Sequence, residues 1–267
     1  MALLLAGRTA DSPFCIDKLN IRIFSREELS YVIVNYPLIA LSGLLSEELI
    51  TWIGNSLHME EFSERLSAEF HAGESTENLL LLILQNGNYC SGEEIRAFRD
   101  LMLSYRKMPD SEIDRETAML YYRVGKYGLC EEKLRDCLSG LKSRILLTRD
   151  SAEKEKLTQA SQDALCDLAA VRMLRFDTEG ALQNLSEAEK AGRFQRAEEY
   201  RYFITGEADL PDSEKEALKK KRSELSKAAA ESEECRKIRE LSPSDENFRK
   251  KTEAIISQWK NEYRKSG

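Results

Sequence analysis

The feature that most constrains this chain is a set of apolar residues, many of them small, that recurs at helical steps between residues 165 and 188. The set comprises Leu165, Leu168, Ala169, Ala181, Leu185 and Ala188. Steps of three or four residues place side chains on one face of a helix. Small side chains at a helix crossing let the two backbones approach closely. The pattern therefore predicts a helical hairpin that packs through small residues.

The same spacing occurs once more, 51 residues earlier in the chain. One copy has Ala118, Tyr121, Gly125, Tyr127, Cys130, Leu134 and Cys137, and the other has Ala169, Arg172, Phe176, Thr178, Ala181, Leu185 and Ala188. A free cysteine packs as a small hydrophobic residue. We therefore expect Cys130 and Cys137 to stand in for alanine at the crossing of two helices.

This spacing resembles the tetratricopeptide repeat, a helix–turn–helix unit of about 34 residues. The resemblance covers residues 73–205 and rests on Ala118, Tyr121, Cys130 and Cys137 in one copy and Ala169, Ala181 and Ala188 in the other. Arg172 departs from the usual Tyr, and Arg193 from the usual Pro. The long step between copies indicates a lengthened helix or an insertion around residues 145–161. An ordinary helical bundle has similar periodicity and remains the alternative.

The composition favours helices: 33% of residues are charged, and only 5 prolines and 13 glycines interrupt the chain. We predict a mainly all-α fold, a solenoid of helical hairpins. Two short strands, at residues 2–6 and 19–24, are expected before the first helix. The predicted segments are 1–72 (strands, then helices), 73–210 (repeat-like hairpins) and 211–267 (a charged helical hairpin whose last helix, 248–263, has one apolar face).

Local signals set the expected helix ends. Ser25 with Glu28 and Ser91 with Glu94 have the spacing of capping boxes, and Gly125 is a natural helix end. The expected helices begin at residues 25 and 46 and span 59–71, 77–85, 91–106, 111–124, 127–141, 151–174, 178–191 and 194–205.

The charge of the chain argues against a general attraction to nucleic acid or anionic lipid. Lys and Arg total 40 and Asp and Glu 47, a net charge of −7. Residues 211–267 nevertheless carry 15 basic and 12 acidic residues, a net +3. No apolar stretch approaches the roughly 20 residues of a membrane span. No signal peptide and no paired-cysteine motif is visible, so we expect a cytoplasmic protein with reduced thiols.

The repeat resemblance implies a concave binding surface on the first helix of each hairpin. Carried over position by position, this surface comprises Glu112, Arg115, Met119 and Tyr122 in one copy, and Asp163, Cys166, Ala170 and Met173 in the other. Methionine and tyrosine suit an adaptable groove for a peptide or helix. The set lacks the lysine–asparagine clamp with which some family members bind C-terminal carboxylates. The alternative is that helices of the same chain cover these residues.

No residue pattern predicts catalysis, a cofactor or a metal site. His58 and His71 are the two histidines, and they do not have a chelating spacing. Cys90 precedes a capped helix whose N-terminus would lower its pKa, but packing is the favoured role. Phosphate-binding loops are absent from the sequence.

The first hypothesis is therefore a non-enzymatic scaffold that binds a peptide or helical segment of another protein. The second is an adaptor for nucleic acid or another anionic surface, working through basic C-terminal helices that include residues 219–222 (KKKR). Flanking glutamates and the lack of interleaved aromatic residues disfavour it. The third is an enzyme whose site is assembled from scattered residues of the amino-terminal segment. The identity of a partner and the oligomeric state stay open.

Overall fold

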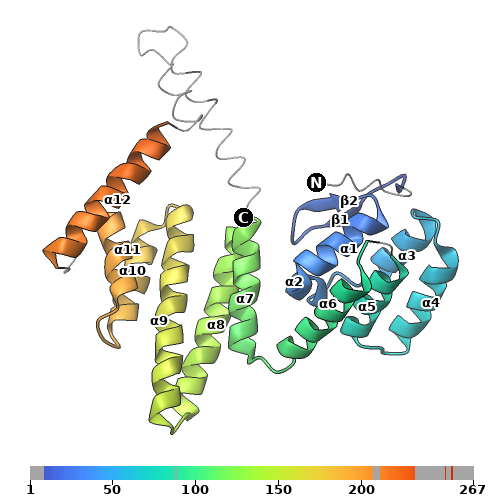
Figure 1. The fold of residues 1–267 in the computed structure, drawn as a ribbon, viewed down its shortest axis with the longest axis horizontal. Helices are drawn as coiled ribbons and strands as arrows, with labels where there is room; N and C mark the ends of the chain where they lie inside the picture. Colours follow the sequence, from blue (N-terminus) through green and yellow to red (C-terminus); the bar gives the residue numbers. More distant parts are fainter. Residues whose placement is uncertain (1–8, 88, 207–210, 232–249, 251–253, 255–267) are drawn as a thin grey trace. The chain divides into compact units, whose positions relative to one another are not determined.

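The chain is mostly helical in the computed structural model, which describes residues 9–87, 89–206, 211–231, 250 and 254 (Figure 1). Within these residues, a two-stranded antiparallel sheet precedes twelve helices. This confirms the predicted mainly α fold with two short N-terminal strands. The chain divides into two compact units, Met1–Val124 (unit 1) and Gly125–Gly267 (unit 2). The division falls inside the predicted segment 73–210.

The sheet of unit 1 consists of β1 (Phe14–Ile16) and β2 (Ile21–Ile23), with Cys15 opposite Arg22. The strand predicted at residues 19–24 is confirmed as β2. The one predicted at residues 2–6 lies outside the described residues. β1 was missed, because Pro13 directly before it favoured a turn at this point.

Seven helices follow in unit 1, and most begin and end where the sequence predicts. They are α1 (Arg26–Asn35), α2 (Pro37–Leu41), α3 (Glu47–Asn55), α4 (Glu60–His71), α5 (Thr76–Asn86), α6 (Gly92–Tyr105) and α7 (Asp110–Arg123). The Ser91 and Glu94 pair forms a complete capping box. Ser25 caps α1 by accepting a hydrogen bond from the Glu28 amide at 3.2 Å. Pro37 opens α2, where its missing N–H costs no hydrogen bond.

Large aliphatic side chains fill the interior of unit 1. Helix α5 contacts α1, α2, α4 and α6, and its Leu80 and Leu84 are fully buried together with Ile33 and Ile53. Helix α7 packs against α2. The six consecutive apolar residues 79–84 fit a helix that other helices surround.

Unit 2 is a series of antiparallel helices. They are α8 (Tyr127–Leu147), α9 (Ser151–Leu174), α10 (Thr178–Glu189), α11 (Gln195–Thr205) and α12 (Asp212–Ala230). Helix α9 contacts α8, α10 and α11, and Figure 1 shows α8, α9 and α10 side by side. Helix α8 runs to Leu147 instead of ending at residue 141. Two long helices, α8 and α9, therefore account for the 51-residue step between the copies.

The small residues of both copies are buried, and Cys137 packs with Leu157 and Ala164 of α9. Ala118, Cys130, Cys137, Ala169, Ala181 and Ala188 are each at most 1% exposed. The residues that end α7 and α9 also match, since Gly125 (φ 73°) and Phe176 (φ 61°) both adopt left-handed backbone. The predicted helix at residues 248–263 lies outside the described residues, except for positions 250 and 254.

Candidate functional site

The first set of predicted surface residues lies on α7, in unit 1. Glu112 is exposed, Arg115 and Met119 are half-buried, and Tyr122 is 42% exposed. Arg115, Met119 and Tyr122 follow each other at steps of four and three residues, so they form a stripe along one side of the helix. We call Glu112, Arg115, Met119 and Tyr122 the α7 stripe. Its two apolar members sit next to each other and reach the surface.

The second set lies on α9, in unit 2, and α11 of the same chain covers it. Cys166 is completely buried and packs in a core with Ala197 of α11, and Met173 packs against the same core. The guanidinium of Arg196 on α11 donates to Asp163 at 3.0 Å and to Asp167 at 2.5 Å.

This burial corrects the assignment of Cys166, and it places Asp163 and Met173 within the protein's own packing. The helical period shows which residues share a face, but it does not tell which helix will cover that face. The two predicted sets belong to different units. Because α11 covers the set on α9, the α7 stripe is the surface that stays a candidate.

A charged cluster that the sequence did not predict lies on α8 and α9. The carboxylate of Glu131, which is 6% exposed, accepts hydrogen bonds from Arg135 at 2.6 Å and from Arg172 at 3.1 Å. Arg175 donates to its second oxygen. The Nη1 atom of Arg172 donates to the carbonyl of Gly180 at 3.0 Å.

This cluster gives a physical reason for the departure at Arg172. A tyrosine at this position would supply packing, whereas the arginine links α9 to α8 and to the first turn of α10. Arg172 and Glu131 are 41 residues apart in sequence, so a local pattern could not have paired them. The one hint of this ion pair in the sequence was Arg172 itself, which stands where the repeat pattern usually has a tyrosine.

The described cysteines other than Cys15 are partly or fully buried, which opposes a nucleophilic role. Burial raises the pKa of the Cys166 thiol to about 12. Burial, with a smaller contribution from Glu94, also raises the pKa of Cys90. The shift is opposite in direction to the lowering that a helix N-terminus can produce, and it agrees with a packing role for Cys90. Cys15 is exposed.

Both histidines lie at the surface. The Nε2 atom of His71 is 2.9 Å from the carboxylate of Glu47, and His58 is exposed. Among the described residues, no group of three His, Cys, Asp or Glu side chains is placed to hold a metal ion. Within the same residues, no helix has the length and apolar character to cross a membrane.

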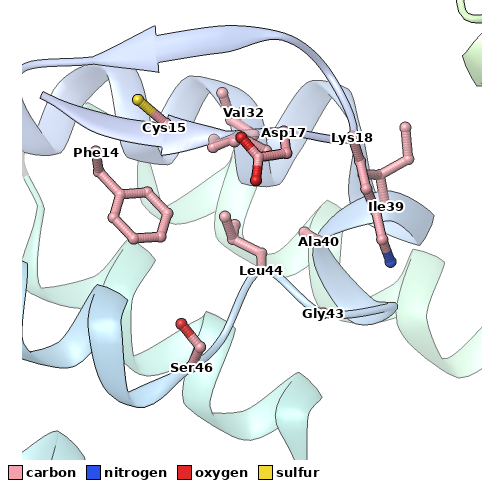
Figure 2. Close-up of a pocket in the computed structure, with 11 residues that line it drawn as sticks. Phe14, Cys15, Asp17, Lys18, Val32, Ile39, Ala40, Gly43, Leu44 and Ser46 are labelled. Carbon is pink, nitrogen blue, oxygen red and sulfur yellow. The ribbon is translucent and has the colours of Figure 1, made fainter. Parts of the chain in front are cut away.

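The amino-terminal segment contains a cavity of about 220 Å³, between β1 and the α1–α2 region (Figure 2). Its wall includes Val32, Ile39, Ala40 and Leu44, all buried. Most of the lining is apolar. The ammonium of Lys18, at one side, donates to the carbonyl of Ser42 at 2.6 Å.

The basic residues 219–222 lie on α12 and are all exposed. Helix α12 contacts α11, where Leu218 packs with Tyr202 and Phe203. The ammonium of Lys221 lies 5.9 Å from the centre of the Phe203 ring.

No family model, no curated protein and no solved structure matches this chain.

Proposed function

We propose that this chain is a non-catalytic interaction module that binds a peptide or helical segment of a partner protein. The observation that carries the proposal is the α7 stripe, where Met119 and Tyr122 lie one turn apart at the surface. Tyrosine is enriched at protein interfaces because its ring offers a large contact area with few rotatable bonds.

The packing of unit 2 supports the repeat-like part of this proposal. In unit 2, Cys130 and Cys137 of one copy and Ala181 and Ala188 of the other are buried at matching positions, and α9 contacts the helices on both sides of it. Helices that pack in series, each against its neighbours, build extended surfaces that serve binding rather than chemistry.

The combination of apolar and polar residues along the stripe favours an amphipathic partner. Glu112 and Arg115 precede Met119 and Tyr122 on the same side of α7. An amphipathic helix would place apolar residues against Met119 and Tyr122, and its polar flank beside Glu112 and Arg115.

Site-specific photo-crosslinking in the source cell tests this proposal. A photoreactive phenylalanine analogue replaces Tyr122, and in the control chain it replaces Leu147, which is 82% exposed at the end of α8. We expect a discrete crosslinked protein from position 122 that is absent from position 147. Mass spectrometry of the crosslinked peptide then identifies the bound segment.

The double variant Met119→Ala/Tyr122→Ala completes the test. Affinity for the identified segment should fall by about tenfold or more, since truncation of a buried aromatic anchor costs 2 kcal/mol or so, while the circular dichroism spectrum stays unchanged. Equal crosslinking at both positions, or full affinity of the double variant, would count against the α7 stripe.

The exposed residues 219–222 favour a second candidate, an adaptor for an anionic surface. Glu214, Glu216 and Glu224 on the same helix weaken the local positive potential. Binding to duplex RNA or DNA that weakens steeply with salt, and is lost when residues 211–267 are deleted, would support this candidate. Binding that is insensitive to the deletion would exclude it.

A further inference from the structure

Two leucines at the end of α8 lie outside the core of unit 2. Leu146 is 79% exposed and Leu147 is 82% exposed. Ile145, one residue earlier, instead packs against the buried Leu141 and Leu157. A helix that packs against one neighbour needs one apolar face, and Ile145 already supplies it at this turn. Packing within unit 2 therefore does not explain why the next two residues are large and apolar.

The two leucines stand at the end of an arm of unit 2, which is formed by the last turns of α8, the turn at residues 148–150 and the start of α9. The side chain of Gln162, in the middle of α9, donates to the last turn of α10 at 2.9 Å. Residues 151–161 of α9 extend beyond this point beside α8, and Figure 1 shows their turn past the end of α10. Leu146 and Leu147, which we call the arm tip, are therefore a convex apolar surface.

Basic side chains flank the arm tip. Residues 142–156 include five basic and three acidic residues, a net +2, although the whole chain has a net charge of −7. One of the five, Arg144, lies 4.0 Å from Glu153. The other four are exposed: Lys142, Arg149, Lys154 and Lys156. Because salt screens charges beyond about 8 Å at physiological ionic strength, the local charge decides what the tip attracts at contact.

The spacing of apolar and basic residues fits a lipid surface. Lys142 precedes Leu146 by four residues, so it lies on the same side of α8, about 5.4 Å further from the tip. Apolar side chains of peripheral proteins enter the boundary between headgroups and acyl chains, and basic residues behind them reach anionic headgroups. A convex apolar end would need a matching pocket in a protein partner, whereas a fluid lipid surface adapts to it.

We propose that the arm tip inserts into the interfacial layer of an anionic lipid membrane. Leu146 and Leu147 enter the boundary between headgroups and acyl chains, and the four exposed basic residues contact the negatively charged headgroups. Attachment is peripheral and reversible, because two leucines bury far less apolar area than a membrane-spanning helix. This surface shares no residue with the α7 stripe or with residues 219–222, so each proposal can fail alone.

Co-sedimentation of the full chain with lipid vesicles tests the proposal. One set of vesicles contains phosphatidylcholine alone, and the other contains equal parts of phosphatidylcholine and phosphatidylserine. We expect the mixed vesicles to bind at least about tenfold more strongly, because each basic residue near an anionic surface adds to the attraction. This binding should weaken as the salt concentration rises.

Matched variants locate the contact. Leu146→Ser/Leu147→Ser should weaken binding to the mixed vesicles at least about tenfold, since two leucines no longer leave water. Leu103→Ser, at a leucine of unit 1 that is 46% exposed, should bind within about twofold of the wild type. Lys219→Gln/Lys220→Gln should also stay within about twofold, which separates the arm from the basic residues of α12. Circular dichroism should show the same helix content for all of them.

A tryptophan at the tip reports insertion directly. Bromine quenches tryptophan fluorescence at short range, so lipids brominated along their acyl chains should quench Leu147→Trp more than the wild-type chain. Equal quenching of the two chains would contradict insertion of the tip.

Four further outcomes would overturn the proposal. The chain may bind neither set of vesicles, or it may bind both sets equally, which would remove the anionic partner. The double leucine variant may bind as well as the wild type while the Lys219→Gln/Lys220→Gln variant loses binding, which would assign lipid contact to α12. A discrete crosslinked protein from position 147 in the source cell would assign the arm tip to a protein partner.

Discussion

The two units bury different kinds of side chain. Among the described residues, most of the large fully buried side chains belong to unit 1, whereas Leu134 of α8 and Leu185 of α10 belong to unit 2. The core of unit 2 contains Ala, Cys and Leu, and its buried polar residues are Glu131, Gln162, Asp167 and Asn184. Unit 1 is held by apolar volume, whereas unit 2 combines close helix contacts with charged links between helices.

This difference indicates which residue types determine how the helices of each unit pack. Aliphatic residues tolerate some exchange, provided that the total volume is kept. A contact of two alanines leaves no room for a larger side chain, and a buried ion pair requires its partner. We therefore expect unit 1 to respond to lost volume and unit 2 to respond to lost polar partners.

Thiol labelling should give the largest difference between the units. In the native protein we expect Cys15 to react with iodoacetamide at least about a hundredfold faster than Cys130, Cys137 and Cys166, since an opening free energy of about 3 kcal/mol reduces the reactive population that much. The raised pKa of Cys166, about 12, further lowers its thiolate fraction. Mass spectrometry after timed labelling measures the rates. Labelling of Cys166 as fast as Cys15 would mean that unit 2 opens readily.

Removing volume from unit 1 should have the largest effect on stability. Leu80→Ala leaves a cavity in a completely buried position and should lower the free energy of unfolding by about 2–5 kcal/mol. Urea unfolding followed by circular dichroism measures this loss. The control Leu103→Ala, at a residue 46% exposed, should cost clearly less. Equal losses for both variants would contradict an apolar core centred on α5.

Removing the central charge of unit 2 should cost somewhat less. Glu131→Gln leaves Arg135, Arg172 and Arg175 without their shared carboxylate and should destabilise by about 2 kcal/mol. This lies below the 3–5 kcal/mol of a fully buried pair, because Arg135 is largely solvent-exposed. Its neighbour supplies the matched control, since Glu132→Gln changes the same charge at an exposed position. A loss below about 0.5 kcal/mol would show that packing alone holds α8 to α9.

The smallest effect is expected at the turn between α9 and α10, and it has the opposite sign. The backbone of Phe176 is left-handed, with φ 61°. Its side chain is 86% exposed. Phe176→Gly should stabilise the protein by about 1 kcal/mol, because glycine adopts left-handed backbone without steric cost. Leu174→Gly, in the last position of α9, should instead destabilise. Differential scanning calorimetry distinguishes the two directions, and a lower melting temperature for Phe176→Gly would assign a packing role to the ring.

Local patterns predicted much of the fold because they act over a few residues. Ser91 with Glu94 marked the start of α6, and the alanines of α9 and α10 marked their buried faces. What the sequence could not provide were contacts between distant residues, such as Glu131 with Arg172 or Asp163 with Arg196. These depend on how helices stack, which a spacing of three or four residues does not encode.

The candidate sites were predicted less well than the fold for the same reason. The α7 stripe stayed at the surface, but Cys166 on the equivalent side of α9 is covered by α11.

The unequal lengths of the unit 2 helices have a consequence for local stability. Helix α10 ends beside the middle of α9, where the Gln162 side chain donates to the carbonyl of Ala188 at 2.9 Å. Residues 151–161 of α9 therefore extend about 16 Å further, at about 1.5 Å per residue, with α8 as their neighbour in unit 2. Because residues 151–161 pack against fewer helices than the rest of α9, we expect them to open at a lower free energy than the part of α9 that contacts α10 and α11.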